Sequence, residues 1–158
     1  NAFAHCRDED IRYEDRQTKI TKQLLDIKTD VVCLQEVMLE KRTCKESGDD
    51  LWGLPAWTDA LIESGYVGIM QGLSQKEWEK NSQRNQRMVG KPIPTGVASF
   101  YRSEIWEEIE PAKHGTGSGT VLFLRKRSFP SLQIAVGNTH LVGDPKKAEA
   151  HLRQLSGL

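Results

Sequence analysis

The residue types best suited to chemistry stand at the ends of two apolar runs. Asn138 and His140 follow the run 132–136, and Gln35 and Glu36 follow the run 31–34. Residues two positions apart on a strand point to the same face, so Asn138 and His140 can reach one ligand. A single histidine after a strand is more often structural than a ligand, but two strands that both end in polar pairs predict a site.

Glu36 is the carboxylate in this set. Mg²⁺ prefers hard oxygen ligands and is often held by only one or two carboxylates, with water and substrate phosphate completing its shell. The far end of a buried strand is also where α/β sheets collect their ligands. On the residues alone, a strand-end glutamate that simply reaches solvent remains the alternative.

Amphipathic helices are expected beside these strands. Residues 16–28 place apolar side chains at helical spacing after Asp15, a candidate N-cap, and residues 54–64 form a second such segment. A final helix begins at Asp144 with Pro145 in its first position and buries a stripe of three apolar side chains, Ala148, Leu152 and Leu155. Helices that alternate with buried strands predict an α/β layer structure.

Short runs rich in β-formers predict the strands. They cover 31–34, 66–70, 97–101, 120–124 and 132–138, and the last two are expected to form a hairpin. Residues 105–109 fit either a short strand or a helical turn. The glycine-rich segment 115–119 lacks the Gly-Lys-Ser/Thr of a phosphate-binding loop and is interpreted as a turn.

Residues 74–94 are polar, with few apolar side chains, and predict a long loop. A solvated loop is preferred over one that contacts substrate. Trp78 lies in this segment and is the one tryptophan proposed for stacking on a nucleotide base. Trp52 and Trp57 are expected in the core.

Composition describes one ordinary globular domain. The 158 residues are 37% apolar, and 22 Lys and Arg balance 22 Asp and Glu, so any polyanion must be held locally. No apolar run approaches the ~20 residues that cross a bilayer, and no leader peptide is visible. Three cysteines without metal-ligand spacing predict reduced thiols and an intracellular, cytoplasmic protein. A nuclear or organellar location stays open as the alternative if an N-terminal targeting sequence has been lost.

Taken in order, the motifs resemble the endonuclease/exonuclease/phosphatase superfamily, and within it the carbon-catabolite-repressor type of deadenylases. The matching blocks are residues 1–4 (NAFA), 13–16 (YEDR), 30–37 (DVVCLQEV), 64–66 (SGY), 96–102 (GVASFYR), 138–141 (NTHL), 144–145 (DP) and 153–154 (RQ). The family's later Asp-x-Asn and Ser-Asp-His blocks are absent. The resemblance therefore implies that residues 1–158 form the first part of a catalytic domain.

The resemblance also implies a fold and a site. The expected fold is half of a four-layer α/β sandwich, a mixed β-sheet with flanking helices, truncated so that the partner sheet is missing. Glu36 would hold Mg²⁺, or Mn²⁺ in its place. His140 and Asn138 would bind the substrate phosphate, and Asn1 and Asn138 would orient water or phosphate around them. The water-activating Asp and a second His would lie in the missing part.

The implied activity is that of a metal-dependent phosphodiesterase, a 3′-to-5′ exoribonuclease that acts on polyadenylate RNA. The isolated chain would be inactive without the later blocks. Two alternatives stay open: a non-catalytic binding module built on the same fold, and a phosphatase or lipid phosphodiesterase of the same superfamily. Nothing in the sequence indicates protein partners.

Overall fold

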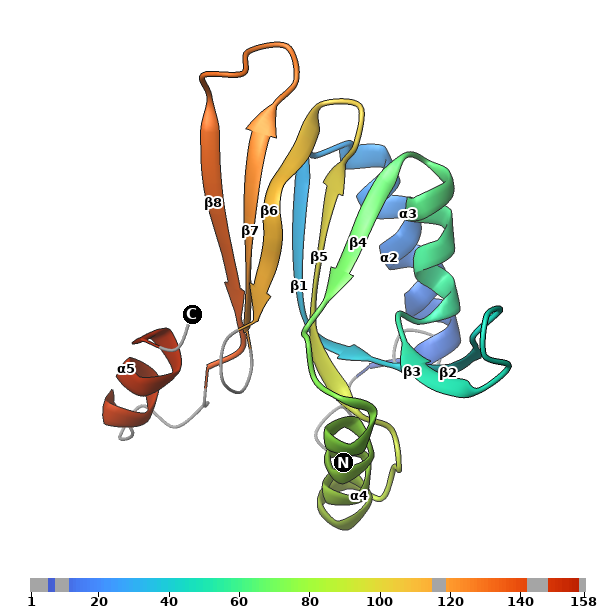
Figure 1. Cartoon of the computed structure of the whole chain (residues 1–158). Helices are drawn as coiled ribbons and strands as arrows, with labels where there is room; N and C mark the ends of the chain where they lie inside the picture. Colours follow the sequence, from blue (N-terminus) through green and yellow to red (C-terminus); the bar gives the residue numbers. More distant parts are fainter. Residues whose placement is uncertain (1–5, 8–11, 115–118, 142–147, 157–158) are drawn as a thin grey trace.

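Two antiparallel sheets lie face to face, and helices cover the outer side of one of them (Figure 1). The computed structural model describes residues 6–7, 12–114, 119–141 and 148–156. One sheet has the strand order β1-β5-β4, and the other has the order β6-β7-β8. The strands are β1 (Val31–Met38), β4 (Tyr66–Met70), β5 (Thr95–Arg102), β6 (Trp106–His114), β7 (Gly119–Lys126) and β8 (Gln133–Thr139).

The central layer is the β1-β5-β4 sheet, which is apolar on both faces. One face packs Val32 and Phe100 against Leu61 of helix α3 (Asp59–Glu63) and Leu24 of helix α2 (Tyr13–Ile27). The opposite face lies against the second sheet, and this interface contains Tyr101, Trp106, Leu122 and Leu124. Burial on both sides explains why β1 and β5 read as continuous apolar runs in the sequence.

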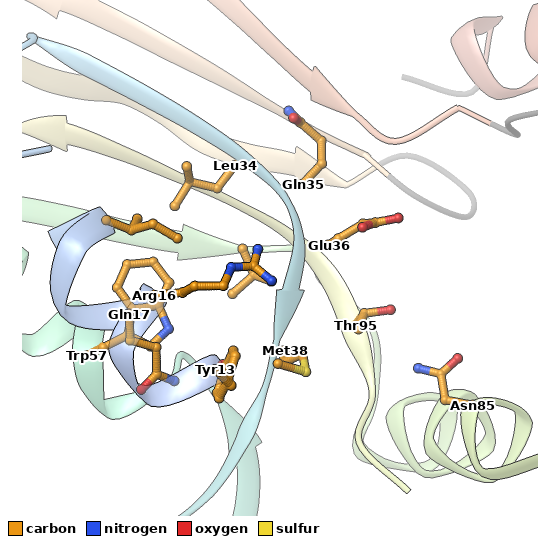
Figure 2. Close-up of a pocket in the computed structure, with 12 residues that line it drawn as sticks. Tyr13, Arg16, Gln17, Leu34, Gln35, Glu36, Met38, Trp57, Asn85 and Thr95 are labelled. Atoms are coloured by element: carbon orange, nitrogen blue, oxygen red, sulfur yellow. The ribbon is translucent and has the colours of Figure 1, made fainter. Parts of the chain in front are cut away.

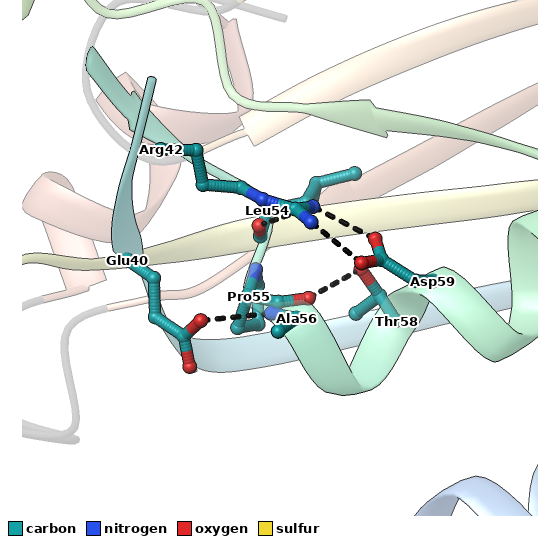
Figure 3. Close-up of polar contacts among 7 residues, drawn as sticks. All are labelled: Glu40, Arg42, Leu54, Pro55, Ala56, Thr58 and Asp59. Atoms are coloured by element: carbon teal, nitrogen blue, oxygen red, sulfur yellow. Dashed lines mark hydrogen bonds and ion pairs between the residues drawn. The ribbon is translucent and has the colours of Figure 1, made fainter. Parts of the chain in front are cut away.

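A small hairpin that the sequence did not predict attaches to the start of α3. It consists of β2 (Glu40–Thr43) and β3 (Asp50–Gly53) and precedes the 3₁₀ turn η1 (Ala56–Thr58). The Arg42 guanidinium donates two hydrogen bonds to Asp59, of 2.7 and 2.5 Å, and Glu40 accepts one from the Ala56 amide (Figure 3). Arg42 lowers the pKa of Asp59 through these bonds. The pairing therefore links the hairpin to the helical layer.

Most of the predicted elements are confirmed. The strand at 66–70 has the predicted bounds, the hairpin of β7 and β8 is present, and residues 106–109 of the ambiguous segment belong to strand β6. The α/β sandwich with flanking helices is confirmed, although the described strands pair only in antiparallel fashion. The expectation that the partner sheet is missing is wrong, because β6, β7 and β8 supply one.

The prediction of a loop at residues 74–94 is wrong. Residues Gln75–Val89 form helix α4, which begins with a capping box: the Ser74 hydroxyl accepts from the Glu77 amide, and the Glu77 carboxylate accepts from the Ser74 amide at 2.8 Å. Such reciprocal bonds satisfy two of the free amides of a helix start. Trp78, proposed to stack on a nucleotide, is 0% exposed and lies in the core instead.

Helix α5 (Ala148–Ser156) stands apart from both sheets (Figure 1). Its predicted buried stripe is not buried, since the side chains of Leu152 and Leu155 are 67% and 48% exposed. The predicted start at Asp144 and Pro145 lies outside the described residues, as does the turn at 115–118. Within the described residues, no helix combines the length and the apolar character needed to cross a bilayer.

We predict that Gly96 is required for α4 to dock. A Cβ atom added there would lie 2.7 Å from Cη2 of Trp78, whose buried ring has little room to move. Gly96→Ala should therefore lower the free energy of unfolding by about 1–3 kcal/mol, as overpacking does. Chemical denaturation measures this. Gly137→Ala is the matched control, because nothing lies within 4 Å of its added Cβ; equal destabilisation of both variants would contradict the packing argument.

Candidate functional site

Glu36 lies inside strand β1, at a bulge, and not at the end of the strand as the sequence suggested. Leu34 pairs with Ala98 and Val37 pairs with Gly96, so Gln35 and Glu36 together oppose one residue of β5. Glu36 has a φ of 55°, which a non-glycine residue adopts at a cost of about 1–3 kcal/mol. Bulges of this kind redirect side chains and are common beside active sites.

The bulge sends two successive side chains in different directions (Figure 2). Gln35 reaches the second sheet, where its Nε2 donates to Oδ1 of Asn138 at 2.6 Å. Glu36 instead extends into solvent, with 74% of its side chain exposed. A regular strand would also alternate its side chains, but the extra residue is what frees Glu36 from the pairing with β5.

His140 meets Glu36 from the other sheet. It follows the last residue of β8, and its Nε2 lies 3.6 Å from Oε1 of Glu36. The imidazole is 48% exposed, and the contact is an ion pair only when the ring is protonated. Two residues that are far apart in the sequence therefore present a carboxylate and an imidazole to the same volume of solvent.

Asn138 lies just behind this pair and is 2% exposed. Its Nδ2 faces three acceptors: the carbonyl oxygens of Leu34 and Ala98, at 3.2 and 3.0 Å, and the hydroxyl of Ser99 at 3.0 Å. Its Oδ1 accepts from Gln35. Two amide hydrogens shared among three acceptors leave no donor for a substrate. In this geometry Asn138 joins the sheets, and the predicted contact between Asn138 and substrate phosphate stays a prediction.

The amide of Asn138 belongs to a buried polar cluster between the sheets. Ser99 of β5 and Thr120 of β7 are both fully buried, and their hydroxyls lie 3.4 Å apart. The cluster thus connects strands β1, β5, β7 and β8 at the level of the bulge. A hydrogen bond in this buried cluster is costly to break, because a polar group that loses its partner there cannot bond to water instead.

A cavity of about 510 Å³ opens beside Glu36 (Figure 2). Five successive residues of β1, 34–38, line it, so it runs along the edge of that strand. Arg16 of α2 and Asn85 of α4 are also in its wall. Arg16 is exposed and forms no side-chain hydrogen bond or ion pair with another described residue. It is the last residue of the family-like block 13–16.

Comparisons with known proteins define the fold. No family model matches the sequence, and no curated protein matches it. The structure is similar to that of ANGEL2, a 2′,3′-cyclic phosphatase, with a TM-score of 0.67 and 21% identity over 99% of this chain. It is also similar to the human Nocturnin catalytic domain, solved with a bound sulfate anion, with a TM-score of 0.61 and 16% identity over 93% of this chain.

The chain has the fold that ANGEL2 and the Nocturnin catalytic domain share. The fold expected from the resemblance is therefore confirmed. The chain spans 40% of the ANGEL2 chain and 51% of the Nocturnin chain, about half of the length of each.

The donor set around Glu36 fits the Mg²⁺ that the superfamily resemblance implies. Among the described residues, no group of three or more His, Cys, Asp and Glu side chains is close enough to hold a metal. One exposed carboxylate beside an open cavity suits a cation that keeps most of its waters. It does not suit a zinc-type site, which needs three or four protein ligands. Asn1, the other predicted site residue, lies outside the described residues.

We predict that Gln35 and Asn138 are energetically coupled. Asn138→Leu should cost about 3 kcal/mol of unfolding free energy, because it leaves buried carbonyl groups without a donor. Gln35→Leu should cost less, and the double variant should lose at least about 0.5 kcal/mol less than the sum of the two. Denaturant titration of all four proteins measures the coupling. Strict additivity would show that the 2.6 Å bond contributes nothing to the union of the sheets.

Proposed function

We propose that this chain is part of the catalytic domain of a metal-dependent phosphodiesterase. The observation that carries the proposal is the approach of Glu36 and His140 to 3.6 Å from two different sheets, in a superfamily fold. A carboxylate and an imidazole that share one solvent-filled volume can hold a cation and a phosphate side by side. Residues 1–158 would supply this electrostatic part of the site.

Glu36 is the residue that would hold Mg²⁺ or Mn²⁺, with its carboxylate directed away from the bulge. When bound, the cation would neutralise charge on the phosphoryl oxygens and stabilise the departing oxygen. His140 would donate a hydrogen bond from its ring to a non-bridging phosphate oxygen, where negative charge increases in the transition state. Asn138 would keep both groups in place through Gln35 and the Leu34 carbonyl.

Hydrolysis adds water across a P–O bond: the water oxygen joins phosphorus, and the departing oxygen takes a proton. None of the described residues beside Glu36 is well suited to remove a proton from that water. Glu36 is assigned to the cation, and Asn138 is already bonded to protein groups. The water activator would therefore lie in the remainder of the domain, and the isolated chain would be inactive.

The substrate class that we propose is RNA, cleaved from its 3′ end as a deadenylase does. The order of the sequence blocks supports this choice, from YEDR at 13–16 to DP at 144–145. A second candidate is hydrolysis of a 2′,3′-cyclic phosphate, which the similarity to ANGEL2 favours. Both reactions break a P–O bond beside a ribose, so the same carboxylate and imidazole could serve either.

We predict that two substitutions separate chemistry from folding in the full-length protein. Glu36→Gln keeps the shape of the side chain but removes its charge, so Mg²⁺-dependent turnover should collapse while the melting temperature changes little. His140→Ala should reduce turnover by about 100-fold to 1,000-fold, the usual cost of one stabilising donor. Steady-state kinetics on polyadenylate RNA, and on RNA that ends in a 2′,3′-cyclic phosphate, provide the measurement.

The two substrates also rank the candidates. Release of 5′-mononucleotides from the polyadenylate supports the exoribonuclease, and conversion of the cyclic end alone supports the cyclic phosphatase. Phe129→Ala is a suitable control, because this exposed residue lies in the connection between β7 and β8, at the opposite end of that hairpin from His140. Normal Mg²⁺-dependent turnover by Glu36→Gln would refute its assignment as the metal ligand.

A further inference from the structure

Helix α4 has one face fixed to the body of the protein. The Trp78 indole is fully buried, and the Ser82 hydroxyl donates to the Pro92 carbonyl at 2.7 Å. The Asn85 side-chain amide donates to the Ile93 carbonyl, also at 2.7 Å. These residues are three or four positions apart, so they lie on one side of the helix. Their contacts leave α4 a single orientation.

The opposite face of α4 is basic. Lys76, Lys80, Arg84 and Arg87 are separated by four, four and three residues, which places them in one stripe of about 80° at 100° per residue. All four are exposed. None of them forms a hydrogen bond or ion pair with another residue in the part of the chain that the structure describes. Like charges at this spacing destabilise a helix by about 0.2–0.5 kcal/mol per pair.

The acidic residues of α4 compensate this stripe only in part, because Glu77, which interacts electrostatically with Lys80, and Glu79 are two negative charges against four positive ones. The Glu77 carboxylate is bonded to the Ser74 amide and hydroxyl, at 2.8 and 2.6 Å, and the hydroxyl bond lowers its pKa. The Glu79 carboxylate accepts from the Trp52 indole at 3.2 Å. Both acids are thus engaged in holding the helix. In a chain with formal net charge zero, the stripe is a local excess of positive charge.

The stripe lies one helix away from the candidate site. Asn85, on the inner side of α4, lines the cavity that also contains Glu36 (Figure 2). A helix with its side chains is about 10–12 Å across, so a few nucleotides would span from the cavity to the basic face. A substrate shorter than this would not reach the stripe. The face carries no aromatic side chain, because the one aromatic residue of α4, Trp78, is buried.

We propose that the basic face of α4 binds the phosphate backbone of a single-stranded polynucleotide whose end lies at Glu36. The polymer's identity rests on the proposed function; the anion-binding face rests on the stripe itself. Binding through lysine and arginine alone is sequence-independent and salt-dependent, since each phosphate contact releases a counterion. The face therefore increases affinity for long substrates without selecting their sequence.

The test compares two triple variants of the full-length protein, each in an otherwise unmodified background. The basic-face variant carries Lys76→Gln, Lys80→Gln and Arg87→Gln. The control variant carries Lys22→Gln, Lys28→Gln and Lys45→Gln, three exposed cations on other surfaces. Glutamine keeps the helix propensity of lysine and arginine, so α4 should remain folded, as circular dichroism can verify.

Binding is measured with fluorescent polyadenylate of about 20 nucleotides at several salt concentrations. The basic-face variant should bind about ten-fold or more weakly, and its log–log salt slope should be shallower by about 0.7 for each phosphate that it no longer neutralises. The control variant should match the unmodified protein. Equal weakening in both triple variants would overturn the proposal, as would a basic-face variant that binds normally.

Hydrolysis separates this proposal from the function on which it rests. The basic-face variant should lose kcat/KM on the long substrate and keep it on a dinucleotide, which cannot reach α4. Normal cleavage of both substrates would overturn the binding face and leave the proposed function standing. If the unmodified protein cleaves neither, the proposed function fails, and the binding measurement alone decides the role of α4. If the basic-face variant bound phosphatidylserine vesicles more weakly but bound RNA normally, the polynucleotide proposal would be overturned in favour of a membrane contact.

Discussion

The constraint on which the site depends is the hydrogen bonding of one buried amide. Asn138 joins β8 to β1 and β5 at the level where β1 bulges. Without the Asn138 amide, the carbonyl groups of Leu34 and Ala98 would lack this hydrogen-bond donor in the interface between the sheets, which is costly. With Asn138 in place those groups are satisfied, and the strained backbone at Glu36 is held by its surroundings. The same amide thus stabilises the fold and positions the carboxylate.

Residues that are close in sequence have different roles on each side of this interface. On β1, Gln35 bonds to the second sheet and Glu36 extends to solvent. Asn138 is buried near the end of β8, and His140, just beyond the strand, is half exposed. The inner pair of side chains fixes the distance between the sheets. The outer pair, Glu36 and His140, is partly exposed to solvent, where the proposed cation and phosphate would bind. Because the inner pair is rigid, the side chains that bind a ligand are already held in place, and binding does not carry the entropic cost of ordering them.

The sequence could predict the elements that are governed by apolar patterning. Strand β4 and the β7–β8 hairpin follow from runs of β-forming residues, and the convergence of two polar pairs follows from their positions after such runs. Helix α4 could not be found in that way, because Trp78 is its one large buried side chain and its other inward contacts are polar. The capping pair of Ser74 and Glu77 was the available signal. The bulge and the hydrogen bonds of Asn138 depend on contacts between residues 39 to 104 positions apart, which no local pattern contains.

The most direct test is a crystal structure of the full-length protein grown with Mn²⁺, whose anomalous scattering locates the ion. The account predicts an anomalous peak within about 2.0–2.2 Å of a Glu36 carboxylate oxygen. It also predicts that His140 borders the same volume and that the hydrogen bond between Gln35 and Asn138 persists. A bound ion elsewhere in the domain, with Glu36 unliganded, would contradict the account. So would an Asn138 side chain that has left Gln35 to contact the metal or a bound phosphate.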